Sequence, residues 1–197
     1  QDDDFYFDVL PDDIKMEILK FADDEPKAFH VGAQGPQILI YHTHTQEAYR
    51  QIEGSEYKES GESRTKDESC SVVAVAEVLK RELESYGYAV LHDTADHEPP
   101  SLKTAYSRSL DTMIKYAREY PTIQVFIDLH RDAIEAADGS VYKTIAQVGD
   151  TTCAQVMLVM GTDSAGLSHP NWRENLKLGL KLQDEMNTLY PSLAKPI

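Results

Sequence analysis

Short apolar runs that suit buried strands alternate with longer segments of helical periodicity, and this alternation constrains the fold most. The strand-like runs occupy residues 37–41, 89–92 and 123–129. Between them, apolar residues recur at helical spacing over 72–86 and 101–120. A strand–helix–strand–helix–strand order predicts an α/β fold, with an open, mostly parallel sheet flanked by helices on both faces.

The remainder of the chain carries further elements. Asp138-Gly139 marks a turn, apolar runs at 143–148 and 154–160 indicate two more strands, and 171–190 has helical spacing. The total length of 197 residues suits one globular domain. We therefore expect residues 31–197 to form a single α/β domain.

The charge of the chain is strongly acidic and uneven. Its 34 Asp and Glu against 19 Lys and Arg give a formal net charge of -15. Many of these acids lie within residues 1–30, so we expect an acidic N-terminal arm. Ile14, Ile18 and Phe21 have helical spacing, which predicts a short helix in this arm. The acidity disfavours nucleic acid and anionic membrane surfaces as partners. No apolar run is long enough to span a bilayer, so membrane attachment would need an anchor that this chain lacks.

Histidines follow two of the predicted strands. His42 and His44 come directly after the strand at 37–41, and His130 follows the strand at 123–129. In open parallel sheets, ligands bind beyond the carboxyl ends of the strands, at the point where the strand order reverses. If the first strand lies between the other two, His44 and His130 share one crevice.

Two imidazoles and a carboxylate, with one position left for water, describe a hydrolytic zinc site. Glu47, Asp67 and Glu68 are all candidates for the carboxylate, and the residues alone leave the choice open. The alternative is that the histidines only form hydrogen bonds with neighbouring acids. Arg131 follows His130 and could orient an imidazole, hold a substrate carboxylate, or pair with Asp132.

Several blocks of the sequence resemble the stage II sporulation protein P family. The most specific are HTHTQEAY at residues 42–49, DLHRDA at 128–133 and HPNWREN at 169–175. Together with ILIY before the first block and SVVAVAEVL between the first and second, they run in order from about residue 37 to the end of the chain.

The resemblance implies a fold similar to the zinc amidases and an activity on peptidoglycan. It implies a zinc-dependent N-acetylmuramoyl-L-alanine amidase, with endopeptidase activity as well, that works outside the cytoplasm during engulfment of the forespore. It also implies a membrane anchor in the full-length protein and a lytic transglycosylase as partner.

The resemblance further implies roles for individual residues. By correspondence with the wider zinc amidases, His44, Glu68 and His130 are the expected Zn²⁺ ligands. Either Glu47 or an acid beyond the end of this chain is expected to take the proton of the attacking water. From the residues themselves, Arg131 is a candidate for holding a peptide carboxylate. Glu47 remains a rival of Glu68 as ligand, because it belongs to the block that resembles the family most closely.

One departure from the family pattern concerns the end of the chain. Family members continue into another strand bearing a Glu-Val-Gly motif, so we expect the domain over residues 31–197 to lack its last strand and that acid. The absence of that acid favours a second hypothesis beside the amidase, a non-catalytic module that binds cell wall or a partner protein. Another zinc hydrolase, such as a deacetylase, is a third hypothesis.

Overall fold

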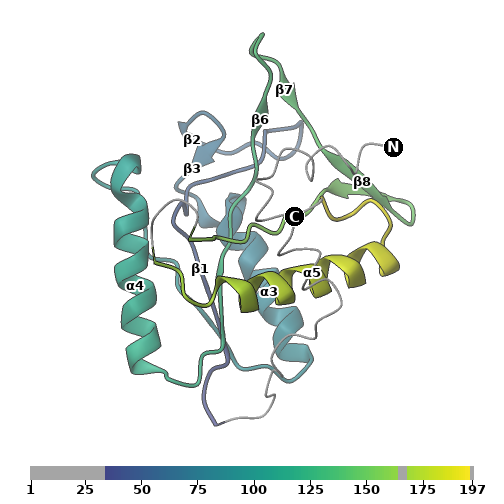
Figure 1. Ribbon diagram of the computed structural model, residues 1–197. Helices are drawn as coiled ribbons and strands as arrows, with labels where there is room; N and C mark the ends of the chain where they lie inside the picture. Colours follow the sequence, from purple (N-terminus) through teal and green to yellow (C-terminus); the bar gives the residue numbers. More distant parts are fainter. Residues whose placement is uncertain (1–33, 164–167, 196–197) are drawn as a thin grey trace. The chain divides into compact units, whose positions relative to one another are not determined.

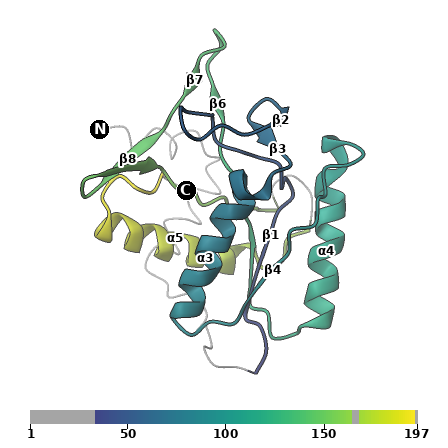
Figure 2. The ribbon, with the colours of Figure 1, turned by 180° about the vertical axis from the view of Figure 1, so that it is seen from behind.

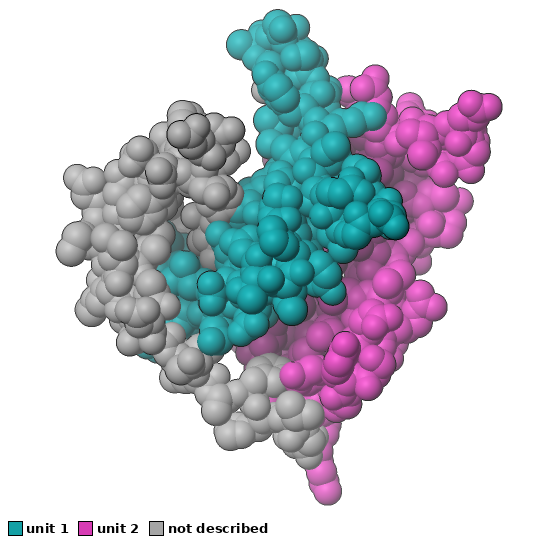
Figure 3. Space-filling view, turned by 90° about the vertical axis from the view of Figure 1, so that its right-hand side faces the viewer, with its two compact units in different colours: residues 1–28, 132–197 teal, residues 29–131 magenta. Residues whose placement is uncertain are grey.

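The computed structural model describes residues 34–163 and 168–195. The chain divides into two compact units, 29–131 and 132–197 together with 1–28 (Figure 3). The acidic arm expected at 1–30 lies outside the described residues, and the expectation that 31–197 forms one domain stays a prediction.

A three-stranded parallel sheet lies at the centre of the unit 29–131. Its strands are β1 (Ile38–Tyr41), β4 (Val90–His92) and β5 (Val125–Asp128), in the order β4-β1-β5. In the register of the sheet, Ile38 lies opposite Val90 on one side and Val125 on the other. The first strand is therefore the central one, and the strand order assumed from the sequence is confirmed.

Two helices connect these strands. α3 (Val72–Ser85) joins β1 to β4, and α4 (Ala105–Glu119), preceded by the 3-10 turn η2 (Leu102–Thr104), joins β4 to β5. The first connection runs from the central strand β1 to the edge strand β4, and the second runs back from β4 to the opposite edge, β5. Because both crossovers are right-handed and run in opposite directions across the sheet, they place the helices on opposite faces. Figures 1 and 2 show α3 and α4 on the two sides of β1.

The core follows the two-residue alternation of the central strand. Ile38 and Ile40 of β1 pack with Ala76 of α3 and Val90 of β4, while the next residue, Leu39, is fully buried on the other face. Burying a side chain of this size stabilises the fold by roughly 1.5–3 kcal/mol.

Local signals set the ends of α3. The Ser71 hydroxyl accepts a hydrogen bond from the Val73 amide, which satisfies one of the unpaired donors of the first turn. The helix ends at Ser85, before Gly87, whose φ of 90° lies in the left-handed region that glycine adopts without strain. The helix predicted over 72–86 is confirmed.

The polar stretch between β1 and α3 contains a small hairpin. β2 (Glu59–Gly61) pairs antiparallel with β3 (Arg64–Thr65), and isolated bridges join Glu47 to Arg64 and Ala48 to Ser71. A 3-10 turn, η1 (Glu68–Cys70), leads into α3. The stretch is thereby folded back against the residues that follow β1.

The unit 132–197 has two antiparallel hairpins and one long helix in its described part. The hairpins are formed by β6 (Ile134–Glu135) with β7 (Val141–Tyr142) and by β8 (Ile145–Val148) with β9 (Thr151–Ala154); the helix is α5 (Trp172–Leu189). Among the described residues, parallel strands therefore occur only in the sheet of β4, β1 and β5, besides one isolated parallel bridge between Val156 and Ala194, and the expectation of a mostly parallel sheet holds only for that sheet.

The strand expected over 154–160 is wrong. β9 ends at Ala154, and beyond it only Val156 forms a bridge, to Ala194. The tight turn at Gly149, with a φ of 57°, pairs the polar residues Thr151 and Thr152 with β8 and so shifts the strand toward the turn. Apolar residues without a partner strand do not form a ladder, and Val159 is 75% exposed.

The described helices were also compared with the length and apolarity that a bilayer requires. None within residues 34–163 and 168–195 is both long and apolar enough to cross a membrane.

Candidate metal centre

The carboxyl ends of β1 and β5 bring two histidines together. His44 follows β1 and His130 follows β5, and their ring centroids are 5.5 Å apart with the ring planes at 65°. Because β1 and β5 are hydrogen-bonded neighbours, the juxtaposition follows from the strand order.

Glu47 is the carboxylate that joins this pair. Its Oε2 lies 3.4 Å from Nδ1 of His130 and accepts a hydrogen bond of 3.0 Å from the Arg131 amide. Burial acts to raise the pKa of Glu47, but the hydrogen bonds from His130 and the Arg131 amide outweigh it and hold the pKa below its ordinary value. Glu47 is therefore an anion beside both imidazoles.

His130 is held from its other side by Asp128, the last residue of β5. Its Nε2 lies 3.1 Å from Oδ1 of Asp128. The hydrogen bonds to Asp128 and to Glu47 raise the pKa of His130 to about 10 in the metal-free protein, against the effect of burial. A metal at Nδ1 would have to replace a proton there.

Asp128 in turn is fixed by the segment that follows β1. It accepts hydrogen bonds from the Thr43 amide (2.8 Å, to Oδ1) and the Thr43 hydroxyl (2.6 Å, to Oδ2). Burial acts to raise the pKa of Asp128, but the hydrogen bonds from His130 and Thr43 bring it below its ordinary value.

His44 has an unsatisfied ring nitrogen. Its Nδ1 is buried and has no hydrogen-bond partner among the residues that the structure describes; the Oε1 atom of Glu98 is 4.0 Å away and is engaged in an ion pair with Arg64. Burial lowers the pKa of His44, so the ring is neutral at pH 7 and carries a nitrogen lone pair.

Tyr106 of α4 forms a wall of the centre. Its ring centroid is 5.5 Å from that of His44 and 6.2 Å from that of His130, yet the residue is 62% exposed. Partial burial and the charges of Asp128 and Glu47 raise the pKa of Tyr106, so the phenol keeps its proton.

Tyr106 is not among the site residues predicted from the sequence. Leu102 and Leu110, which lie at helical spacing from it, are also about half exposed, and the buried residues of α4 are Ala105 and Ser109. The sequence feature that could have identified Tyr106 is its position in the first turn of the helix, because that turn lies at the same end of the sheet as the histidines.

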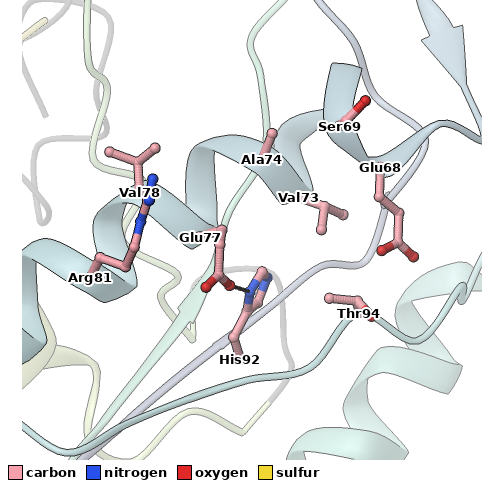
Figure 4. Close-up of a pocket in the computed structure, with 9 residues that line it drawn as sticks. All are labelled: Glu68, Ser69, Val73, Ala74, Glu77, Val78, Arg81, His92 and Thr94. Atoms are coloured by element: carbon pink, nitrogen blue, oxygen red, sulfur yellow. Dashed lines mark hydrogen bonds and ion pairs between the residues drawn. The ribbon is translucent and has the colours of Figure 1, made fainter.

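The other candidate carboxylates lie elsewhere. Asp67 caps η1 by accepting hydrogen bonds from Ser69. Glu68 lines a depression beside α3 together with Glu77 and His92 (Figure 4). Within the described residues, neither carboxylate has a hydrogen bond to His44 or His130, so the structure does not bring Glu68 to the pair, and its assignment as ligand stays a prediction.

His42 points away from the pair. Its side chain is buried; Nδ1 donates to the Leu129 carbonyl at 2.8 Å, and Nε2 lies 2.9 Å from Nε2 of His92. The Nδ1 atom of His97 donates to the His42 carbonyl at 2.7 Å. These three histidines hold the ends of β1, β4 and β5 in place.

Arg131 contributes chiefly through its backbone. Its amide donates to Glu47, Nη2 donates to the Ser63 carbonyl at 3.3 Å, and the buried Nε has no partner in the described part of the chain. Asp132 pairs with Lys195 at 2.7 Å. The amide contact orients Glu47. That Arg131 orients an imidazole or holds a substrate carboxylate stays a prediction.

His44, Glu47 and His130 are of the residue types that bind zinc. Within residues 34–163 and 168–195, no group of three or more His, Cys, Asp or Glu side chains has the spacing that a metal ion needs. Nδ1 of His44, which has no partner among the described residues, nevertheless suits a ligand atom, and a tetrahedral site with bonds of about 2.0–2.1 Å separates its ligand atoms by about 3.4 Å. The Glu47–His130 pair has this separation, 3.4 Å.

The fold and the centre define an α/β protein with a histidine–carboxylate cluster beyond the carboxyl ends of a parallel sheet. The chain belongs to the stage II sporulation protein P family, whose model matches residues 12–197. No curated protein and no solved structure matches the chain. Membership implies a membrane-associated role in engulfment during sporulation.

Proposed function

We propose that this protein is a peptidoglycan hydrolase, a zinc-dependent N-acetylmuramoyl-L-alanine amidase. The observation that carries the proposal is the meeting of His44 and His130, with ring centroids 5.5 Å apart, beside the Glu47 carboxylate. Two imidazoles and one carboxylate that leave a position open are the ligand set of hydrolytic zinc sites.

We assign the three ligand positions to His44, Glu47 and His130. Glu47 is preferred to Glu68 because it already contacts His130, whereas Glu68 lines the depression beside α3. When bound, zinc polarises the scissile carbonyl and lowers the pKa of a water molecule from 15.7 toward about 7.

The chain's own residues supply the proton and charge chemistry. Oε1 of Glu47 has no hydrogen-bond partner in the described residues, so a Glu47 that binds metal through Oε2 keeps an oxygen that can take the proton of the attacking water. The phenol of Tyr106, protonated and exposed, can donate a hydrogen bond to the carbonyl oxygen as negative charge develops on it.

The same arrangement suits a substrate with peptide carboxylates. Arg131, the residue after His130, carries a half-buried guanidinium, of which Nη2 donates to the Ser63 carbonyl. A bound stem peptide would place its carboxylate against this guanidinium and its lactyl amide against the histidines. A peptide cross-link bound in the same way would have its amide bond beside the histidines and could be cut, which is the endopeptidase activity expected from the family.

The proposal includes the location and partners expected from the family. The substrate is peptidoglycan between the mother-cell and forespore membranes, with a lytic transglycosylase acting on the glycan strands. The net charge of -15 disfavours nucleic acid in this role.

Digestion of purified sacculi by the zinc-loaded full-length protein tests the function. Muropeptide analysis should detect free stem peptides, and the His130→Ala protein should release none. Binding to sacculi without any released product would overturn the amidase in favour of a wall-binding module. Release of acetate in place of stem peptides would identify a deacetylase.

A further inference from the structure

Asp128 has a position that a mere surface acid would not have. It ends β5 at the carboxyl edge of the sheet, half-buried, and three hydrogen-bond donors surround its carboxylate. Two come from Thr43, the residue between His42 and His44, and the third is Nε2 of His130. Asp128 therefore connects the segment after β1 with the histidine that follows β5.

The hydrogen bonds leave the carboxylate no freedom to turn. The Thr43 amide and Nε2 of His130 share Oδ1, at 2.8 and 3.1 Å, while the Thr43 hydroxyl takes Oδ2 at 2.6 Å. The Thr43 hydroxyl is itself 2.6 Å from the Ser109 hydroxyl of α4. A carboxylate can only accept, so Nε2 of His130 must carry a hydrogen.

The tautomer of His130 follows from this contact. A neutral imidazole with its hydrogen on Nε2 has its lone pair on Nδ1, and Nδ1 is the nitrogen that lies 3.4 Å from Glu47. Carboxylates that fix the free nitrogen of a metal-binding histidine typically affect metal affinity by about 10- to 100-fold.

We infer that Asp128 is a positioning residue that makes His130 bind the metal through Nδ1. The inference rests on the proposed function, because it concerns the zinc site proposed there. Asp128 contacts neither metal nor substrate; it acts through His130 and, by way of Thr43, through the segment that carries His44.

The geometry distinguishes two substitutions at this position. In Asp128→Asn, the Thr43 amide requires an oxygen at the Oδ1 position, so the amide oxygen still accepts from Nε2 of His130 and the amide nitrogen faces the Thr43 hydroxyl. That hydroxyl can then accept and donate onward to Ser109. Asp128→Ala removes the acceptor altogether. The asparagine variant should therefore retain the tautomer, and the alanine variant should lose it.

The experiment measures zinc affinity by chelator competition and the ring nitrogens of ¹⁵N-histidine by NMR, on zinc-loaded protein. We expect Nε2 of His130 to be protonated and Nδ1 metal-bound in the wild type and in Asp128→Asn. Asp128→Ala should bind zinc about 10- to 100-fold more weakly. Asp93→Ala, which removes a carboxylate just after β4 that bonds the Tyr116 hydroxyl, is the matched control and should keep wild-type affinity.

The outcomes separate the inference from the proposed function. Zinc bound by the wild type through Nε2 of His130, or equal affinities of Asp128→Ala and Asp93→Ala, would overturn the inference and leave the zinc site standing. A wild type that binds no zinc would overturn both. Circular dichroism of the metal-free variants identifies loss of folding, and the nitrogen assignment in the wild type decides the inference without any variant.

Discussion

Oε2 of Glu47 lies 3.4 Å from Nδ1 of His130, although the two residues belong to segments that follow different strands. The contact exists because β1 and β5 are neighbours and because the polar stretch after β1 folds back, with Glu47 bridged to Arg64. Two questions of chemistry depend on it: which carboxylate binds the metal, and which nitrogen of His130 does.

Exchanging the two candidate carboxylates separately should identify the ligand. Glu47→Gln replaces an anionic oxygen beside both histidines with a neutral amide, so zinc affinity should fall by at least about tenfold, the lower end of what loss of a metal-site contact costs. Glu68→Gln, the matched control, should bind zinc as the wild type does, because Glu68 lines a different depression. Chelator competition measures both. A loss confined to Glu68→Gln would restore the assignment expected from the wider zinc amidases.

Much of the sheet could be predicted from the sequence, whereas the carboxylate that meets His130 could not. The runs around Ile38, Val90 and Val125 are short, apolar and separated by helical spacing, so their parallel pairing follows from few alternatives. Choosing Glu47 over Glu68 requires knowing how the residues between them fold back, and nothing in their composition specifies the bridge to Arg64.

Errors at the edges of the fold have a similar origin. Helical periodicity reports which residues of α4 share a face but not what covers that face, so it does not distinguish Tyr106 from a core residue. The apolar run after Ala154 predicted a strand, but a strand needs a neighbouring strand to pair with. The turn at Gly149 pairs β8 with Thr151 and Thr152 instead.

Metal removal should destabilise the wild type more than a variant that lacks a ligand. A ligand that binds only the folded state stabilises it by RT ln(1 + [L]/Kd), about 2.7 kcal/mol at a hundredfold excess over Kd. Thermal unfolding with zinc and with chelator should therefore differ for the wild type and coincide for His130→Ala.

His92→Gln is the control for this measurement, because His92 contacts His42 and Glu77 rather than the pair of His44 and His130. It should retain the zinc-dependent increase in melting temperature. An unchanged increase in His130→Ala would show that zinc binds elsewhere.

Removing the hydroxyl of Tyr106 should affect turnover without affecting zinc. Tyr106→Phe keeps the ring against His44 and His130 but deletes the donor proposed for the developing oxyanion, and loss of one such donor lowers kcat by about 100-fold or more. Stem-peptide release from sacculi measures the rate. Tyr116→Phe on the same helix, whose hydroxyl bonds Asp93, should act at the wild-type rate. Equal rates for the two variants would exclude the phenol from the reaction.

The pH dependence of stability should reveal the buried His42. Burial lowers the pKa of His42 to about 4 in the folded protein from 6.5, so between these values the unfolded chain binds the proton and the folded protein does not. Stability contributed by neutral His42 is therefore complete above pH 6.5 and is lost as the pH falls toward 4, by up to about 1.4 kcal/mol per pH unit. The raised pKa of His130 affects stability in a separate pH range, between 6.5 and about 10.

His42→Asn tests this prediction, because it keeps a donor for the Leu129 carbonyl but cannot titrate. Its denaturation midpoint in the metal-free protein should vary less between pH 6.5 and 4 than that of the wild type, even if the variant is less stable throughout. Parallel pH profiles for the two proteins would assign the acid sensitivity to other groups.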